Sequence, residues 1–331
     1  MLNSPIKVFH CTLLPVCVLL CATSLAQDAP PPDEPPPSAK AEAAKLTVTL
    51  VDAGAEPRRT VRYSARVGQQ ETLVISMRMA MAMSMNDEEM PEQTFPEFRF
   101  TVVGEVKEIA ANGDIHSRME YTQVKVVDEP GVDPMMLSMM EEMCAAVTGM
   151  SATCVTTGRG ETISAEYEHG RNLDPRIAEQ LTDLPRMLAQ FGAILPEEPV
   201  GDGARWRLHG PITSGGMVIN TSSDFTLTAV TDTEMSLEST ATQTADPQDV
   251  PMPDMPGQTL HLKSLKSDGG GKMRVRLDRP MAVQGEVKTE TTIEMSFDLF
   301  GEEGTMRQRM SIRLSISPGE TAKEKEPGEA R

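Results

Sequence analysis

Apolar and polar residues alternate one by one along most of the chain between residues 45 and 317. Near the start of this region, Leu46, Val48 and Leu50 alternate with Thr47 and Thr49. Because successive side chains of a β-strand point to opposite faces, the alternation predicts strands with one apolar face and one wet face. The same pattern recurs in the ranges 61–67, 98–102, 225–229, 260–262, 273–277, 293–299 and 310–316.

Short sequences rich in Gly, Asn and Asp separate several of these segments. Such sequences favour the tight turns that join antiparallel strands, so they predict β-hairpins. The expected turns lie at residues 112–113, 232–234, 268–271 and 301–304.

Two segments in mid-chain have apolar residues at spacings of three and four instead of two. These segments, 134–147 and 174–195, are predicted to be amphipathic helices, although Pro185 would kink or divide the second. We therefore predict a mainly β (α+β) fold, in which a strongly curved antiparallel sheet or open barrel accompanies two mid-chain helices.

The first 26 residues have the three parts of a secretory signal peptide. Lys7 is followed by a short apolar run over residues 11–21, and Ser24 and Ala26 stand where small residues precede a cleavage site. We expect cleavage after Ala26 and export to the periplasm or cell envelope. Lipid anchoring at Cys21 is the less favoured alternative, because leucines and not small residues precede it.

Composition divides the remaining chain into a tether, a folded region and a tail. Residues 27–44 are rich in proline and predict a disordered tether, and residues 318–331 predict a disordered tail. Residues 45–317 are expected to form a single β-rich domain, or two similar halves (45–170 and 200–317) joined by the helix at 174–195. We find no further segment long and apolar enough to span a bilayer.

The charge and the absence of familiar motifs limit the classes of function. A formal net charge of −18 makes the chain a poor partner for nucleic acid. The sequence contains no phosphate-binding glycine loop, no nucleophile elbow and no H-E-x-x-H motif. We therefore expect a monomeric, non-enzymatic protein without a cofactor.

Five methionines at every second position are the most unusual feature of the sequence. On a strand they would share one face, and the helix expected at 134–147 adds further methionines. The candidate ligand-binding residues are Met77, Met79, Met81, Met83, Met85, Met136, Met139, Met140 and Met143.

Three interpretations of these methionines remain open. They could fill the core beneath a curved sheet, or line a cavity for an apolar ligand such as a lipid or acyl chain. They could also bind Cu(I) through Met79, Met81 and Met83, because soft thioethers favour that ion. Neighbouring thioethers on one strand are about 6.6 Å apart, so a copper site would need a second strand. A structural or protein-interaction module without a small ligand is the third functional hypothesis.

Cys144 and Cys154 are the two cysteines that remain after cleavage of the expected signal peptide. In an oxidising compartment a close pair of this kind predicts a disulfide. The disulfide would join the helix at 134–147 to the following strand.

The segment from Leu195 to Trp206, LPEEPVGDGARW, resembles a phrase found in uncharacterised exported β-rich proteins of bacteria. Its prolines would end the preceding helix, its glycines would form a turn, and Trp206 would begin a strand. The layout is more loosely similar to the periplasmic lipoprotein-carrier fold, which holds acyl chains between an open barrel and a helical lid. Neither resemblance assigns a role to any residue.

Overall fold

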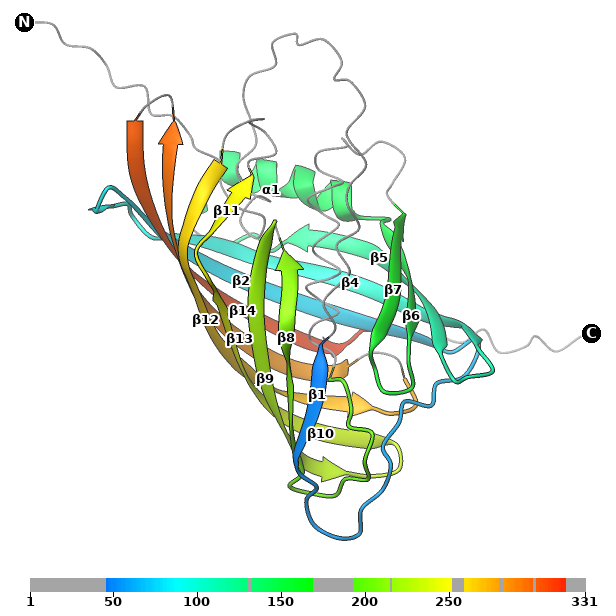
Figure 1. The fold of residues 1–331 in the computed structure, drawn as a ribbon. Helices are drawn as coiled ribbons and strands as arrows, with labels where there is room; N and C mark the ends of the chain where they lie inside the picture. The colour runs from blue at the N-terminus through cyan, green and yellow to red at the C-terminus, as the bar shows by residue number, and fades with distance from the viewer. Residues whose placement is uncertain are drawn as a thin grey trace, which may run out of the picture.

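The computed structural model describes residues 46–129, 132–168, 193–214, 216–251, 259–279, 282–299 and 302–319. Its strands form one antiparallel sheet of 14 strands, which curves strongly around a concave side (Figure 1). The strands are β1 Thr47–Asp52, β2 Gln70–Met85, β3 Glu88–Glu89, β4 Gln93–Ile109, β5 Ile115–Val126, β6 Ser151–Thr156, β7 Thr162–Glu168, β8 Arg205–Ser214, β9 Met217–Val230, β10 Glu234–Ala245, β11 Gln248–Pro251, β12 Thr259–Arg276, β13 Ala282–Leu299 and β14 Glu302–Pro318.

The order across the sheet is β1-β8-β9-β10-β12-β13-β14-β2-β4-β5-β6-β7, with β3 beside β2 and β11 beside β12. The strands at the two ends are β1 and β7, and within the described residues no pairing between them closes the sheet. The prediction of a mainly β fold with a single antiparallel sheet is confirmed. The division into two similar halves stays a prediction.

The helix α1 spans Pro134–Val147, as the spacing of its apolar residues predicts. Asp133 caps its start, because the Asp133 carboxylate accepts hydrogen bonds from the backbone N–H groups of Met135 (2.8 Å) and Met136 (3.3 Å). Proline at the first position suits a helix start, where its missing N–H costs nothing. Within the described residues, no helix is long and apolar enough to cross a membrane.

The structure describes one α-helix and not the two expected. Residues 174–192 of the second expected helix lie outside the described residues, as do the expected signal peptide, the tether and residues 320–331 of the tail. The end of that helix, Ala193–Leu195, is not helical. Both of these side chains are almost fully buried in the core, and Trp206 Nε1 donates a hydrogen bond to the carbonyl of Ile194 (3.0 Å). The aromatic ring of Trp206 anchors this segment against the sheet.

The two faces of the sheet differ sharply in chemistry. The inner, concave face carries three large apolar clusters. The outer face carries cross-strand ion pairs such as Arg307–Glu294 (2.6 Å) and Lys272–Glu238 (2.6 Å). The segregation follows the one-by-one alternation of the sequence, since each strand turns its apolar side chains inward.

Three sequence predictions about strands and turns are wrong. Residues 302–304 of the turn expected at 301–304 belong to β14, where Gly304 pairs with Phe297 of β13. Residues 61–67 alternate like a strand but form an extended segment outside the sheet, where Val61 and Ala65 are buried. Residues 268–271 were expected to form a turn, yet β12 runs straight through them and pairs with β10 and β13 on either side.

The glycines at 269–271 have a packing role in place of a turn. A Cβ atom on Gly270 would lie 2.6 Å from the carbonyl oxygen of Ser239, and one on Gly269 would lie 2.9 Å from that of Lys288. A Cβ on Gly271 would overlap the carbonyl oxygen of Glu286. Glycine inside a strand often marks a close approach of neighbouring backbone at a bend, which fits the strong curvature here.

We expect Gly271→Ala to lower the free energy of unfolding by about 1–3 kcal/mol, because the added methyl group forces β12 and β13 apart. Urea unfolding followed by circular dichroism measures this. Gly158→Ala is the control, since a Cβ there meets nothing closer than a backbone oxygen at 3.9 Å. Equal stability of Gly271→Ala and the wild type would contradict the close approach.

Candidate functional site

The five alternating methionines all lie on the inner face of β2, but their surroundings change along the strand. Met77 and Met79 are buried, at 8% and 5% exposure, in the same apolar cluster as Met140 of α1. At this end of β2 the strand and the helix therefore pack directly on each other. Met81, Met83 and Met85, farther along, are only partly buried.

The methionines of α1 are divided between the core and the surface. Met140 is fully buried, and Met136 and Met139 pack at the edge of its cluster. Met143 is partly buried, whereas Met135 is 82% exposed. Of the candidate ligand-binding residues, the structure brings together those of the first half of β2 and of α1, chiefly as core.

Methionines on β14 and β13 extend the row on β2 sideways. Met310 of β14 is directly opposite Met81, and Met306 of β14 is opposite Met85. Met295 of β13 is in turn opposite Met306. Sequence analysis missed these partners, because strand order is not visible in the alternation of a single segment.

A belt of small and hydroxyl-bearing side chains crosses the inner face between two apolar clusters. On β10, for example, it lies between the buried residues Leu237 and Ala245. The register continues the belt from Ala241 to Gly269 on β12 and on to Thr289 on β13. The belt consists of partly exposed positions: Thr221, Ser223, Ser239, Ala241, Gln243, Gly269, Gly271, Val287, Thr289 and Thr291.

Small side chains at inward positions leave space above the sheet, which larger residues would fill. The apolar clusters on either side contain larger side chains, among them Leu, Ile, Met, Phe and Trp. Sequence analysis did not identify the belt. The sequence feature that could reveal the belt is Ser, Thr, Ala or Gly, in place of large apolar residues, at the inward-pointing positions of four neighbouring strands.

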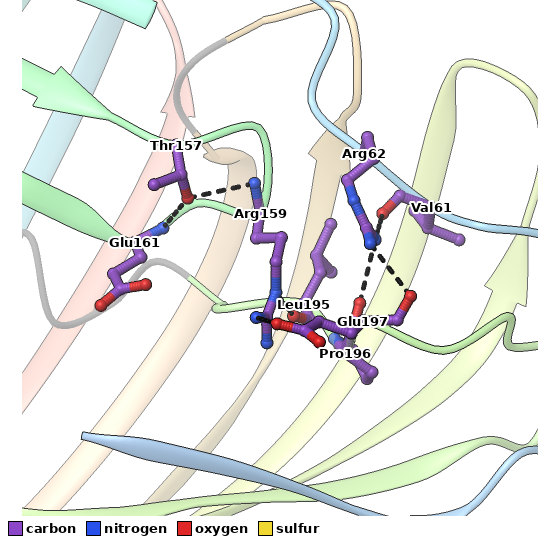
Figure 2. Close-up of polar contacts among 8 residues, drawn as sticks. All are labelled: Val61, Arg62, Thr157, Arg159, Glu161, Leu195, Pro196 and Glu197. Atoms are coloured by element: carbon purple, nitrogen blue, oxygen red, sulfur yellow. Dashed lines mark hydrogen bonds and ion pairs between the residues drawn. The ribbon is translucent and has the colours of Figure 1, made fainter. Parts of the chain in front are cut away.

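Two irregular segments bridge the opening of the sheet near β1 and β7, and Arg62 joins them (Figure 2). The guanidinium group of Arg62 donates hydrogen bonds to the carbonyl oxygens of Val61 (2.7 Å), Pro196 (2.9 Å) and Glu197 (3.0 Å). Partial burial, with the positive charge of Arg159 nearby, holds the pKa of Arg62 below its usual value. Arg62 remains charged because the pKa of arginine is far above neutral.

Arg159 makes the second part of this connection from the turn between β6 and β7. Arg159 Nε donates to the carbonyl of Leu195 (2.7 Å), and Arg159 Nη1 pairs with the carboxylate of Glu197 (2.8 Å). Figure 2 shows the two arginines reaching the same short segment from opposite sides. The backbones of Arg59 and Val200 then pair as an isolated antiparallel bridge next to β1. The β6–β7 hairpin is thus tied to the opposite end of the sheet without strand pairing.

Glu71, at the start of β2, is a buried carboxylate on the inner face. Its side chain is 7% exposed, and its nearest ion-pair partner is Arg279 at 3.9 Å. Glu71 Oε2 and Arg279 Nε are buried without a hydrogen-bond partner among the described residues. Burial raises the pKa of Glu71 to about 7, although the positive charges of Arg279 and Arg276 oppose the shift and Asp278 adds to it.

The predicted disulfide between Cys144 and Cys154 is wrong, because both are free, buried thiols. Cys144 lies on α1 beside Val124 of β5, whereas Cys154 of β6 is opposite Ser117 of β5. Seven residues of strand separate these two positions on β5, about 23 Å at the usual rise. A disulfide requires Cα atoms within about 7 Å. The sequence spacing looked close only because a turn after α1 brings β6 back along β5.

A groove of about 540 Å³ lies between α1 and the part of β5 that extends beyond β6. Val124, Lys125, Glu141, Cys144 and Thr148 are among its lining residues. Thr148 covers part of the strand edge, since its hydroxyl accepts a hydrogen bond from the backbone N–H of Val124 (3.2 Å). In the described part of the chain, no group of three or more His, Cys, Asp or Glu side chains is arranged to hold a metal ion.

No protein-family model matches the chain, and no curated protein matches it. Among solved structures, the chain is weakly similar to an outer membrane channel from Pseudomonas putida F1. That similarity has a TM-score of 0.12 and 8% sequence identity, and it covers 77% of this chain and 97% of the channel. A TM-score this low does not establish a shared fold, so function has to be inferred from the geometry of the chain itself.

The raised pKa of Glu71 leads to a pH dependence of stability. The pKa of the folded state, about 7, exceeds the ordinary value of 4.5, so the folded protein retains a proton that the unfolded chain loses. Between pH 4.5 and pH 7 we expect stability to fall as pH rises, relative to Glu71→Gln, which has no such contribution. Urea unfolding of both proteins at pH 4.5, 6 and 8 measures the difference. A parallel pH profile for the two proteins would show that Glu71 ionises normally.

The two thiols are expected to react slowly in the folded protein. Burial raises the pKa of Cys144 to about 11 and also raises that of Cys154, so little thiolate is present at neutral pH. Without reductant, iodoacetamide should modify both thiols in urea and neither in buffer within the same time. A mass two hydrogens below that of the reduced chain, with no modification in urea, would show that the two cysteines form a disulfide after all.

Proposed function

We propose that the chain is an exported, monomeric, non-enzymatic protein that binds an apolar ligand, such as a lipid or acyl chain, on the inner face of its open sheet. The observation that carries the proposal is the belt of small, partly exposed side chains between two apolar clusters. A concave, largely apolar surface with a few polar groups is the usual form of a small-molecule site.

The ligand position differs from the one that the sequence suggested. Met77, Met79 and Met140 fill the space between β2 and α1 with their own side chains. The belt offers more room, because glycine and alanine lie opposite each other at Gly269 and Ala241. Met81 is partly buried on the same inner face, where its flexible side chain suits a ligand of variable shape.

The outer face is a poor alternative for an apolar ligand. Its side chains are charged and paired across strands, for example Arg207 with Asp224 at 2.8 Å and Arg78 with Glu97 at 3.0 Å. Covering such pairs with an apolar ligand would remove them from water without replacing their hydration.

A bulky residue in the belt should block binding. We expect Ala241→Phe, which points inward, to weaken binding of a fluorescent fatty acid by at least about tenfold, or 1.4 kcal/mol. Thr242→Phe is the matched control, since it adds a similar volume to the exposed outer face of the same strand. Thermal unfolding checks that both variants fold.

The comparison of the two variants decides the proposal. Loss of binding in Ala241→Phe alone supports a ligand in the belt. Equal binding in both variants, or no binding by the wild type, would contradict it and favour a structural or protein-interaction module.

A further inference from the structure

We propose that three methionines at one end of the inner face form a binding site for a soft monovalent cation, Cu(I). The thioether sulfurs of Met85, Met306 and Met295 would be its ligands. The site is separate from the belt and from the proposed apolar ligand.

The sheet register brings these thioethers together from three neighbouring strands. Met306 of β14 is directly opposite Met85 on one side and Met295 on the other. Directly opposite residues have Cβ atoms about 4.5–5.5 Å apart, so Met85 and Met295 each lie one strand away from Met306. The flexible side chains of Met85 and Met295 can turn their sulfurs toward an ion above Met306. Met83 is a diagonal neighbour of Met306 at about 7–8 Å and borders the site without being a ligand.

A copper site needs thioethers from more than one strand, and β14 supplies the strand that the methionine row on β2 lacks. The earlier candidate set, Met79, Met81 and Met83, lies along a single strand, and its first member is buried opposite Ile312. The set around Met306 instead runs across strands, where directly opposite residues are closer than the roughly 6.6 Å between alternate residues of one strand.

The surroundings suit a soft ion of low charge. Met295 and Met306 are buried at 0% and 3% exposure, and Met83 packs against their cluster. Neutral sulfur ligands in an apolar cluster favour Cu(I) over ions that require oxygen or nitrogen ligands. Met85 is partly exposed, so an ion can reach it from solvent.

An acidic turn follows the end of β2 that carries Met85. Asp87, Glu88 and Glu89 are exposed there, and Glu89 pairs with Arg309 at 3.7 Å. The charges of Asp87 and Glu88 raise the local concentration of cations near the partly exposed thioether of Met85. The carboxylates attract the ion, and the buried sulfurs select it.

Anaerobic titration with Cu(I), kept reduced by ascorbate and competed with a coloured Cu(I) chelator, tests the site. We expect wild-type protein to withdraw one Cu(I) from the chelator. The double variant Met85→Leu/Met306→Leu should bind at least about tenfold more weakly, because leucine keeps the volume but removes the sulfur.

The double variant Met77→Leu/Met140→Leu is the matched control, since it removes two thioethers from the cluster beneath α1. Its affinity for Cu(I) should equal that of the wild type, and thermal unfolding should show all three proteins folded. No withdrawal of Cu(I) by the wild type, or equal loss in both double variants, would overturn the site and leave these methionines as core. Binding of the fatty acid is measured separately, so failure of one proposal leaves the other intact.

Discussion

Two arginine side chains and two backbone hydrogen bonds, Tyr63 N–H to the carbonyl of Gly158 (2.8 Å) and Leu195 N–H to that of Arg159 (2.9 Å), connect the ends of a sheet that strand pairing leaves open. Arg62 and Arg159 bind the segment from Leu195 to Glu197 between the β6–β7 hairpin and the region beside β1. A buried carbonyl that loses its donor costs about 1–3 kcal/mol, so these contacts matter more than exposed ion pairs would. The tie connects the two ends of the sheet in place of pairing between β1 and β7.

Some parts of the inner face are covered by other chain segments and others are not, and the residues of the two kinds of region differ in size. Where other chain segments cover the sheet, its residues are large and buried, as Trp206 is beneath Ile194 and Met77 is beneath α1. The belt contains small side chains and glycine instead, and the glycines also let β10, β12 and β13 approach closely. Curvature and open space on the inner face thus depend on the same residues, which links the fold to the proposed ligand site.

The sequence predicted local structure well and long-range contacts poorly. The alternation identified the inner row on β2, and the apolar spacing identified α1 with its correct bounds. It failed at residues 61–67, where burial against the core produces alternation without strand pairing, and at 269–271, where glycine serves close packing. The disulfide prediction failed because spacing along the chain does not reveal which strand positions face α1. The belt and the Met306 cluster depend on register between distant strands, and a single sequence does not encode register visibly.

A high-resolution structure of the protein, purified gently from its native cells without removal of lipids, tests the central claim most directly. The account predicts elongated density of a non-protein molecule along the belt, in contact with Ser239, Ala241 and Thr289. Ordered water or the protein's own side chains filling that space would contradict it. The inner face would then be part of the core, and the openness of the sheet would need another explanation.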